Sequence, residues 1–124
     1  RVFPGEGVHS ERLADLVLGD GFGRCCANPL PQAAIRAAQA NGLSVARNYP
    51  YAGGFITQHY GQPASGLHAL QLEFARPLYM DEATRVLRPE SAIVTDTVTA
   101  IIAEVAGLSP ALLRPPPMVM AGED

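Results

Sequence analysis

Residues 14–46 alternate between short apolar runs and one amphipathic segment, and this order restricts the possible folds more than any other feature. Ala14–Leu18 (ADLVL) is a short apolar run, which is typical of a buried strand. Leu43–Ala46 is the next such run, and the residues between the two carry helix signals. Two strands joined by a helix through short links form a βαβ unit, whose strands pair in parallel. The sequence therefore predicts an α/β fold.

The helix between these strands has a clear predicted start and end. Asn28 is a favoured N-cap residue, and Pro29 and Pro31 fit the first helical turn. Asn41-Gly42 ends the pattern, because glycine readily adopts the backbone conformation that closes a helix. One face of this helix is expected to cover the sheet, and it carries Leu30, Ala34, Ile35 and Ala38.

The rest of the chain adds a third strand and a second helix. Leu67–Phe74 is the strand, and residues 89–106 form the clearest helix, which Gly107 ends. The apolar stripe of that helix comprises Val94, Val98, Ile101, Ile102 and Val105. The predicted architecture is a three-layer sheet with covering helices, formed by residues 1–108. The prolines that follow Ser109 predict a disordered tail over residues 109–124.

Composition excludes several classes of partner. A chain of 124 residues fits one domain, and its net charge of −3 without a basic stripe argues against nucleic acid. No apolar run approaches the ~20 residues needed to cross a bilayer, and no signal peptide opens the chain. The adjacent Cys25 and Cys26 could pair only with strain, so we expect two buried, reduced thiols in a cytoplasmic protein. A small-molecule ligand is the expected partner.

The segment Asn48–Glu82 concentrates the polar chemistry of the chain. It contains two of the three histidines together with Gln71, Glu73 and Arg76. Asn48–Gly66 is predicted to be a long glycine-rich loop, and long loops in compact domains are usually functional. We therefore expect the ligand site here.

Glu73 is the strongest candidate for catalysis. In the predicted strand it shares one face with Gln71, while Leu72 and Phe74 share the other. A carboxylate near a strand's end can act as a general base. A salt bridge with Arg76 or with another arginine is an equally good explanation of the same residue.

The other candidates each have a structural alternative. His59 and His68 could bind a metal or a substrate carboxylate, although a hydrogen-bonded structural histidine is the commoner case. Arg47 and Arg76 could each hold an anion or form a structural ion pair. Tyr51, Tyr60 and Tyr79 could line a pocket or pack at an edge. The chain contains no HExxH motif and no Cys/His cluster at zinc-ligand spacing.

Three segments carry a resemblance to a known family: ADLVLGDGFGRCC, RNYPYAGGFITQHYGQP and GLHALQLEFARPLYMDE. In this order they resemble the C-terminal half of the N-formylglutamate amidohydrolase (N-formylglutamate deformylase) family, from about Ala14 to Glu82. The resemblance implies a phosphorylase/hydrolase-like α/β fold related to the zinc carboxypeptidases. It also implies hydrolysis of N-formyl-L-glutamate to formate and L-glutamate, in histidine degradation, with a divalent metal, usually zinc.

The same resemblance implies roles for individual residues. Glu73 of the QLE segment would be the general base and acid, and Arg76 would pair with a glutamate carboxylate. The substrate pocket would be lined by Asn48, Tyr51, Thr57, His59, His68, Gln71 and Arg76.

The chain also departs from the family pattern. Family members carry a D-x-H-S-M segment among their metal ligands, whereas residues 7–11 read Gly-Val-His-Ser-Glu. We therefore expect the metal ligands upstream of Arg1, so that this chain is part of a domain. Gln58 stands where family members commonly carry Arg, and Phe74-Ala75 replaces a common Ile-Asn.

Three interpretations follow. The chain is the acid/base and pocket half of a deformylase, a non-catalytic remnant or carboxylate-binding module, or a same-fold amidohydrolase for another N-acyl amino acid.

Overall fold

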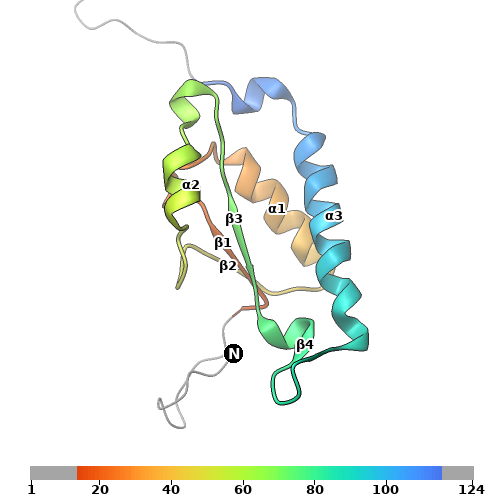
Figure 1. Ribbon diagram of the computed structural model, residues 1–124. Coiled ribbons are helices and arrows are strands. Elements are labelled where there is room, and N and C mark those ends of the chain that lie inside the picture. Colours follow the sequence, from red (N-terminus) through yellow and green to blue (C-terminus); the bar gives the residue numbers. More distant parts are fainter. Residues whose placement is uncertain (1–13, 116–124) are drawn as a thin grey trace, which may run out of the picture.

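The structure is a computed structural model that describes residues 14–115. Its centre is a three-stranded mixed sheet of order β2-β1-β3, formed by β1 (Leu16–Gly19), β2 (Val45–Arg47) and β3 (Gln71–Phe74). β1 and β2 pair in parallel, and helix α1 (Pro29–Ala40) connects them (Figure 1). The predicted βαβ unit is therefore confirmed.

β3 pairs with β1 in the antiparallel direction, and the register assigns its two faces. Leu72 lies opposite Leu18 and Phe74 lies opposite Leu16, so both belong to the core face. Glu73 lies opposite Val17 on the other face, which we call the second face. The predicted alternation is confirmed, but the strand is shorter than Leu67–Phe74 because residues 68–70 run outside the ladder.

Helices α1 and α3 (Ala92–Ala106) pack against each other on the core face of the sheet. Leu16 and Leu18 are fully buried beneath them, together with Ala34, Ala38 and Ile101. The short helix α2 (Phe55–Tyr60) lies on the opposite side of the sheet (Figure 1). Two helices thus cover the core face of a mixed sheet, whereas α2 is too short to cover the second face, and Glu73 stays exposed there.

Helix α2 falls inside the segment predicted to be loop, so that part of the prediction is wrong. Its flanks are Gly54 at the start and Gly61 at the end, and neither supplies a capping side chain. The Gly54 N–H is satisfied instead by the Gln71 side chain on β3, at 2.8 Å. A tertiary contact stabilises this helix, which is why local sequence signals did not reveal it.

Two details of the predicted helices also need correction. Asn28 occupies the N-cap position of α1 but makes no capping bond, because its Oδ1 accepts a hydrogen bond from Arg47 Nη2 at 2.8 Å. In α3, Ile102 is 63% exposed, whereas Thr97 is fully buried. Ile101 of the predicted stripe is buried and Val105 packs against the core, so Ile102 is the member of the stripe that the prediction placed wrongly.

The remaining elements are short. A hairpin of β4 (Met80–Asp81) and β5 (Val86–Leu87) precedes α3, and Asp81 Oδ1 accepts the Ala83 and Thr84 N–H groups of its turn. Four 3₁₀ turns cover Pro63–Ser65, Arg76–Leu78, Pro89–Ser91 and Pro110–Leu113. No helix within residues 14–115 is long and apolar enough to cross a membrane.

Residues 110–113 belong to the segment predicted to be a disordered tail, yet they form a 3₁₀ turn that is tied to the body of the fold. The Leu113 carbonyl lies 2.7 Å from His68 Nε2. The rest of the predicted tail, residues 116–124, and the segment containing His9 lie outside the described residues.

Candidate active site

Glu73 lies on the second face of β3 beside a small cavity of about 110 Å³. Tyr51, Arg76 and Tyr79 line this cavity with it, over a floor that includes the buried Val17. Three of the residues predicted for the site, Glu73, Tyr51 and Arg76, are therefore brought together from separate segments.

Arg76 enters the cavity because β3 ends at Phe74 and the chain turns at once into a 3₁₀ helix that begins with Arg76 and Pro77. Glu73 and Arg76 are both exposed. Over residues 14–115 neither side chain forms an ion pair, so the predicted alternative of a Glu73–Arg76 salt bridge is not formed. Both charges face solvent and are available to a ligand.

Tyr51 reaches the cavity because the segment after β2 crosses the second face above Gly19. A Cβ atom at Gly19 would lie 2.6 Å from the Gly53 nitrogen and 2.7 Å from the Ala52 carbonyl carbon. The Gly21 N–H also donates to the Ala52 carbonyl at 2.7 Å. Only glycine at position 19 permits this approach, which sets where Tyr51 lies.

A buried network centred on Asp20 fixes the start of the same segment. Asp20 follows β1 and is fully buried, and its Oδ2 accepts hydrogen bonds from Arg47 Nη2 at 2.5 Å and Nε at 3.2 Å. Its Oδ1 accepts bonds from Asn48 Nδ2 at 2.5 Å and from the Gly23 N–H at 3.2 Å. Arg47 also reaches Asn28 at the start of α1. One carboxylate thus joins the ends of both parallel strands.

Asn48, predicted to bind substrate, is a member of this network. Its backbone adopts a left-handed conformation with φ of 63°, which Asn tolerates better than most residues. Its Oδ1 accepts the Asp20 N–H at 2.9 Å, so both ends of its amide are bound to Asp20. The described structure uses the Asn48 side chain to hold the backbone at the point where the chain turns toward Tyr51.

The Asp20 carboxyl stays ionised in spite of its burial. Burial raises the pKa of this carboxyl, but the hydrogen bonds from Arg47, Asn48 and Gly23 and the charge of Arg47 together outweigh that effect. The pKa of Asp20 consequently lies below its ordinary value of 3.8.

Gln71 and Thr57 meet at the start of α2. Gln71 Oε1 accepts the Gly54 N–H at 2.8 Å and lies 3.5 Å from Thr57 Oγ1. Thr57 is only 7% exposed, whereas Gln71 is half-buried. Two residues predicted for the pocket therefore connect α2 to the strand that carries Glu73.

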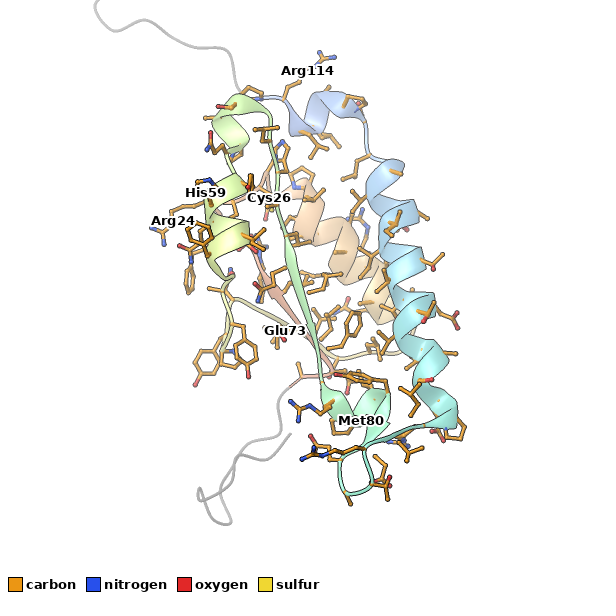
Figure 2. All side chains as sticks on the ribbon, in the orientation of Figure 1. Arg24, Cys26, His59, Glu73, Met80 and Arg114 are labelled. Carbon is orange, nitrogen blue, oxygen red and sulfur yellow. The ribbon has the colours of Figure 1, made fainter. Side chains whose placement is uncertain are left out.

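Neither His59 nor His68 lines the cavity beside Glu73. His68 connects two segments, because its Nδ1 accepts the Ala27 N–H at 3.0 Å and its Nε2 lies 2.7 Å from the Leu113 carbonyl. An amide N–H can only donate and a carbonyl can only accept, so the ring is in its Nε2–H form. His59 is exposed on α2 (Figure 2). Its ring stacks with Phe55 at a centroid distance of 5.1 Å and lies edge-on to Tyr60.

The cysteines behave as the sequence predicted. Cys25 and Cys26 are each 2% exposed and are not joined by a disulfide. Burial, helped by the nearby charge of Asp20, raises the pKa of Cys26 to about 12 and also raises the pKa of Cys25. Both are therefore inert thiols in the fold.

The described residues do not form a metal site. Within residues 14–115 no three His, Cys, Asp or Glu side chains lie close enough together to hold a metal ion. The donor set around Glu73 consists of Arg76 and two tyrosines, which does not fit zinc.

Sequence reasoning did not single out Asp20, and it named Tyr79 only as a residue that could line a pocket or pack at an edge. Asp20 was visible only within ADLVLGDGFGRCC, one of the segments that carry the family resemblance. A signal was present, because a carboxylate directly after a buried parallel strand lies at the edge of the sheet where α/β proteins build their sites.

Comparisons with known proteins show what this chain is similar to. The family model of N-formylglutamate amidohydrolase matches residues 2–80. The N-formylglutamate deformylase of Pseudomonas aeruginosa is 47% identical over 73 residues, which are 57% of this chain and 27% of that protein. The N-formylglutamate deformylase of Pseudomonas putida is 41% identical over 73 residues, with the same coverage.

A solved structure shares the fold. The crystal structure of N-formylglutamate amidohydrolase from Ralstonia eutropha JMP134 superposes with a TM-score of 0.66 and 35% sequence identity, over 77% of this chain and 34% of that one. The chain thus spans about a quarter of the length of the curated relatives that it matches. Since the family model covers well over half of its residues, the chain belongs to the N-formylglutamate amidohydrolase family.

Proposed function

We propose that this chain supplies the general base and part of the substrate pocket for hydrolysis of N-formyl-L-glutamate to formate and L-glutamate. The observation that carries the proposal is the position of Glu73, an exposed carboxylate without an ion-pair partner in residues 14–115, beside Arg76 and Tyr51. The names of the matched relatives support the choice of substrate.

In the proposed reaction Glu73 first accepts a proton and later donates it. Its carboxylate accepts a proton from the attacking water as the water oxygen bonds to the formyl carbon. The C–N bond then breaks, and Glu73 gives the proton to the departing nitrogen of glutamate. The formyl carbon leaves as formate, and Glu73 returns to its ionised form.

Arg76 and the tyrosines orient the substrate in this scheme. N-formyl-L-glutamate carries two carboxylates, and a guanidinium is suited to bind one of them through two parallel hydrogen bonds. The cavity of about 110 Å³ is smaller than the ~300 Å³ at which pockets for drug-sized ligands begin, so it holds one end of the substrate. The remaining walls come from outside the described residues in the proposed enzyme.

The divalent metal that family membership implies has no ligand set within residues 14–115, so no step of this scheme passes through it. In the proposed enzyme its ligands, like the missing walls, belong to a part outside these residues.

A second candidate function is a carboxylate-binding module without turnover. It is favoured by the exposed guanidinium of Arg76, which forms no ion pair within residues 14–115 and is suited to hold a carboxylate. In that case the cavity would bind the substrate carboxylate without hydrolysing the amide.

Formate release from N-formyl-L-glutamate tests the proposal, with and without added zinc, cobalt or manganese. Glu73→Gln should abolish release, while Glu82→Gln in the exposed hairpin should not, although both variants remove one carboxylate. Binding of N-formyl-L-glutamate without formate release by the unsubstituted chain would favour the binding module. Faster release from another N-formyl or N-acetyl amino acid would change the assigned substrate.

A further inference from the structure

We propose that Gln71 is a fixed hydrogen-bond donor to the ligand, with its amide nitrogen held toward an oxygen of a molecule bound beside Glu73. This inference rests on the proposed function and specifies how the site would recognise its substrate. The group recognised is a carboxylate or carbonyl oxygen, and not an ammonium or hydroxyl hydrogen.

The orientation of the Gln71 amide follows from its partner. The atom that faces the Gly54 nitrogen lies 2.8 Å away. A backbone N–H can only donate, so the facing atom must be the carbonyl oxygen Oε1. Thr57 Oγ1 lies 3.5 Å from the same oxygen and can donate to it as well. The other end of the amide, Nε2, is therefore the end that bonds neither Gly54 nor Thr57.

The amide nitrogen remains available. Within residues 14–115 Gln71 Nε2 has no hydrogen-bond partner, and it is not among the buried polar atoms that lack one. It therefore contacts solvent, where two N–H donors can reach a ligand. Amide donors left without an acceptor in a closed site would cost free energy, so a ligand oxygen at this point is favoured.

The register places this donor beside the proposed base. Gln71 and Glu73 are two residues apart on the second face of β3, which separates their Cα atoms by about 6.6 Å along the strand. Gly19 lies opposite Gln71 and has no side chain, and the backbone of Ala52 and Gly53 passes over it. A substrate whose amide lies at Glu73 can thus offer another of its oxygens to Gln71.

The consequence is discrimination by hydrogen bonding. A site with a committed donor rejects analogues that lack the matching acceptor, because the donor is then left unpaired. The contacts with Gly54 and Thr57 fix the direction of this donor, because they prevent the Gln71 side-chain amide from flipping by 180°. In this scheme Gln71 is a specificity residue, and Thr57 is a positioning residue that acts through it.

Gln71→Glu separates the two ends of the amide. One carboxylate oxygen can still accept from Gly54 and Thr57, whereas the other replaces the donating nitrogen with an acceptor. Gln39→Glu, on the exposed face of α1, adds the same charge away from the site. We expect the Kd for N-formyl-L-glutamate, measured by NMR titration of the full chain, to rise about tenfold or more in Gln71→Glu and to stay unchanged in Gln39→Glu.

A second measurement uses the unsubstituted chain. Its result therefore does not depend on whether a variant folds or on the charge that a substitution adds. The Nε2 proton resonances of Gln71, assigned through its own side-chain carbons, should shift as N-formyl-L-glutamate is added. Binding by the unsubstituted chain with no shift of these protons, or with equal affinity in Gln71→Glu, would overturn the role of Gln71 and leave the proposed function standing. No binding by the unsubstituted chain would instead overturn the proposed function, and this inference with it.

Discussion

Arg47 binds Asp20 through two nitrogens, and the carboxylate that it binds is completely shielded from solvent. The pair joins the carboxyl ends of β1 and β2, and Arg47 extends the link to Asn28 at the start of α1. A buried ion pair that is fully hydrogen-bonded adds little to stability compared with an apolar pair. Loss of one partner, however, leaves the other as an uncompensated buried charge. The pair therefore fixes how the two strands and the helix meet.

Arg47→Met should destabilise the fold by about 3 kcal/mol, at the lower end of the range for broken buried pairs, because Arg47 itself is 33% exposed. Urea denaturation followed by circular dichroism measures the change. Arg36→Met is the matched control, since the Arg36–Glu104 pair is exposed at 4.0 Å and its loss should cost less than about 1 kcal/mol. Equal losses in the two variants would contradict the role of the buried pair.

Acid should weaken the fold through Asp20. The folded-state pKa of Asp20 lies below 3.8, so between that pKa and 3.8 the unfolded chain binds more protons than the folded one. The contribution of Asp20 is complete above about pH 5 and is lost as pH falls through the folded pKa. The free energy of unfolding, measured in urea at several values from pH 6 to pH 2.5, should show this decrease.

Asp20→Asn removes the titrating group and provides the comparison. Its free energy of unfolding should be lower at pH 6 and should fall less steeply below pH 4. Parallel pH curves for the two proteins would show that Asp20 does not titrate as described.

His68→Ala should destabilise the fold by about 1–3 kcal/mol, because the Ala27 N–H and the Leu113 carbonyl both lose their partner. Hydrogen exchange at the Ala27 amide should accelerate, which identifies the bond that was lost. His59→Ala is the control, since His59 is exposed and its removal should change stability by no more than about 0.5 kcal/mol. Slow exchange at Ala27 in His68→Ala would contradict the assigned contact.

Much of the fold was predictable from local patterns. The βαβ unit follows from two apolar runs and a helix with clear ends, and period-two alternation placed Gln71 and Glu73 on one face of β3. These features depend on residues close in sequence. The spacing of their apolar side chains reflects which face of the helix or strand packs against the core.

Contacts between distant segments explain what was not predictable. Helix α2 depends on Gln71, seventeen positions after Gly54, and its own residues carry no cap. Asn28 is a residue type that favours the N-cap, but its side-chain oxygen accepts a hydrogen bond from Arg47 instead of capping the helix. In α3 the packing against α1 selects Thr97 over Ile102 for the interior, although hydrophobicity alone favours the reverse.

The site was predictable only in part for the same reason. Glu73, Arg76 and Tyr51 share a cavity because the chain crosses above Gly19, and no pattern around Tyr51 encodes that crossing. His68 has polar atoms suited to a ligand, yet within the described chain both its nitrogens serve the fold.

The antiparallel register of β3 makes the packing of the core and the orientation of the site residues depend on each other. Leu72 and Phe74 enter the core only when Gln71 and Glu73 face the other way. A slip of one residue would carry the Glu73 carboxylate into the leucine layer and expose the leucine in its place. A chain with β3 in the wrong register would therefore fail to form its core, so a folded molecule has Gln71 and Glu73 on the correct face.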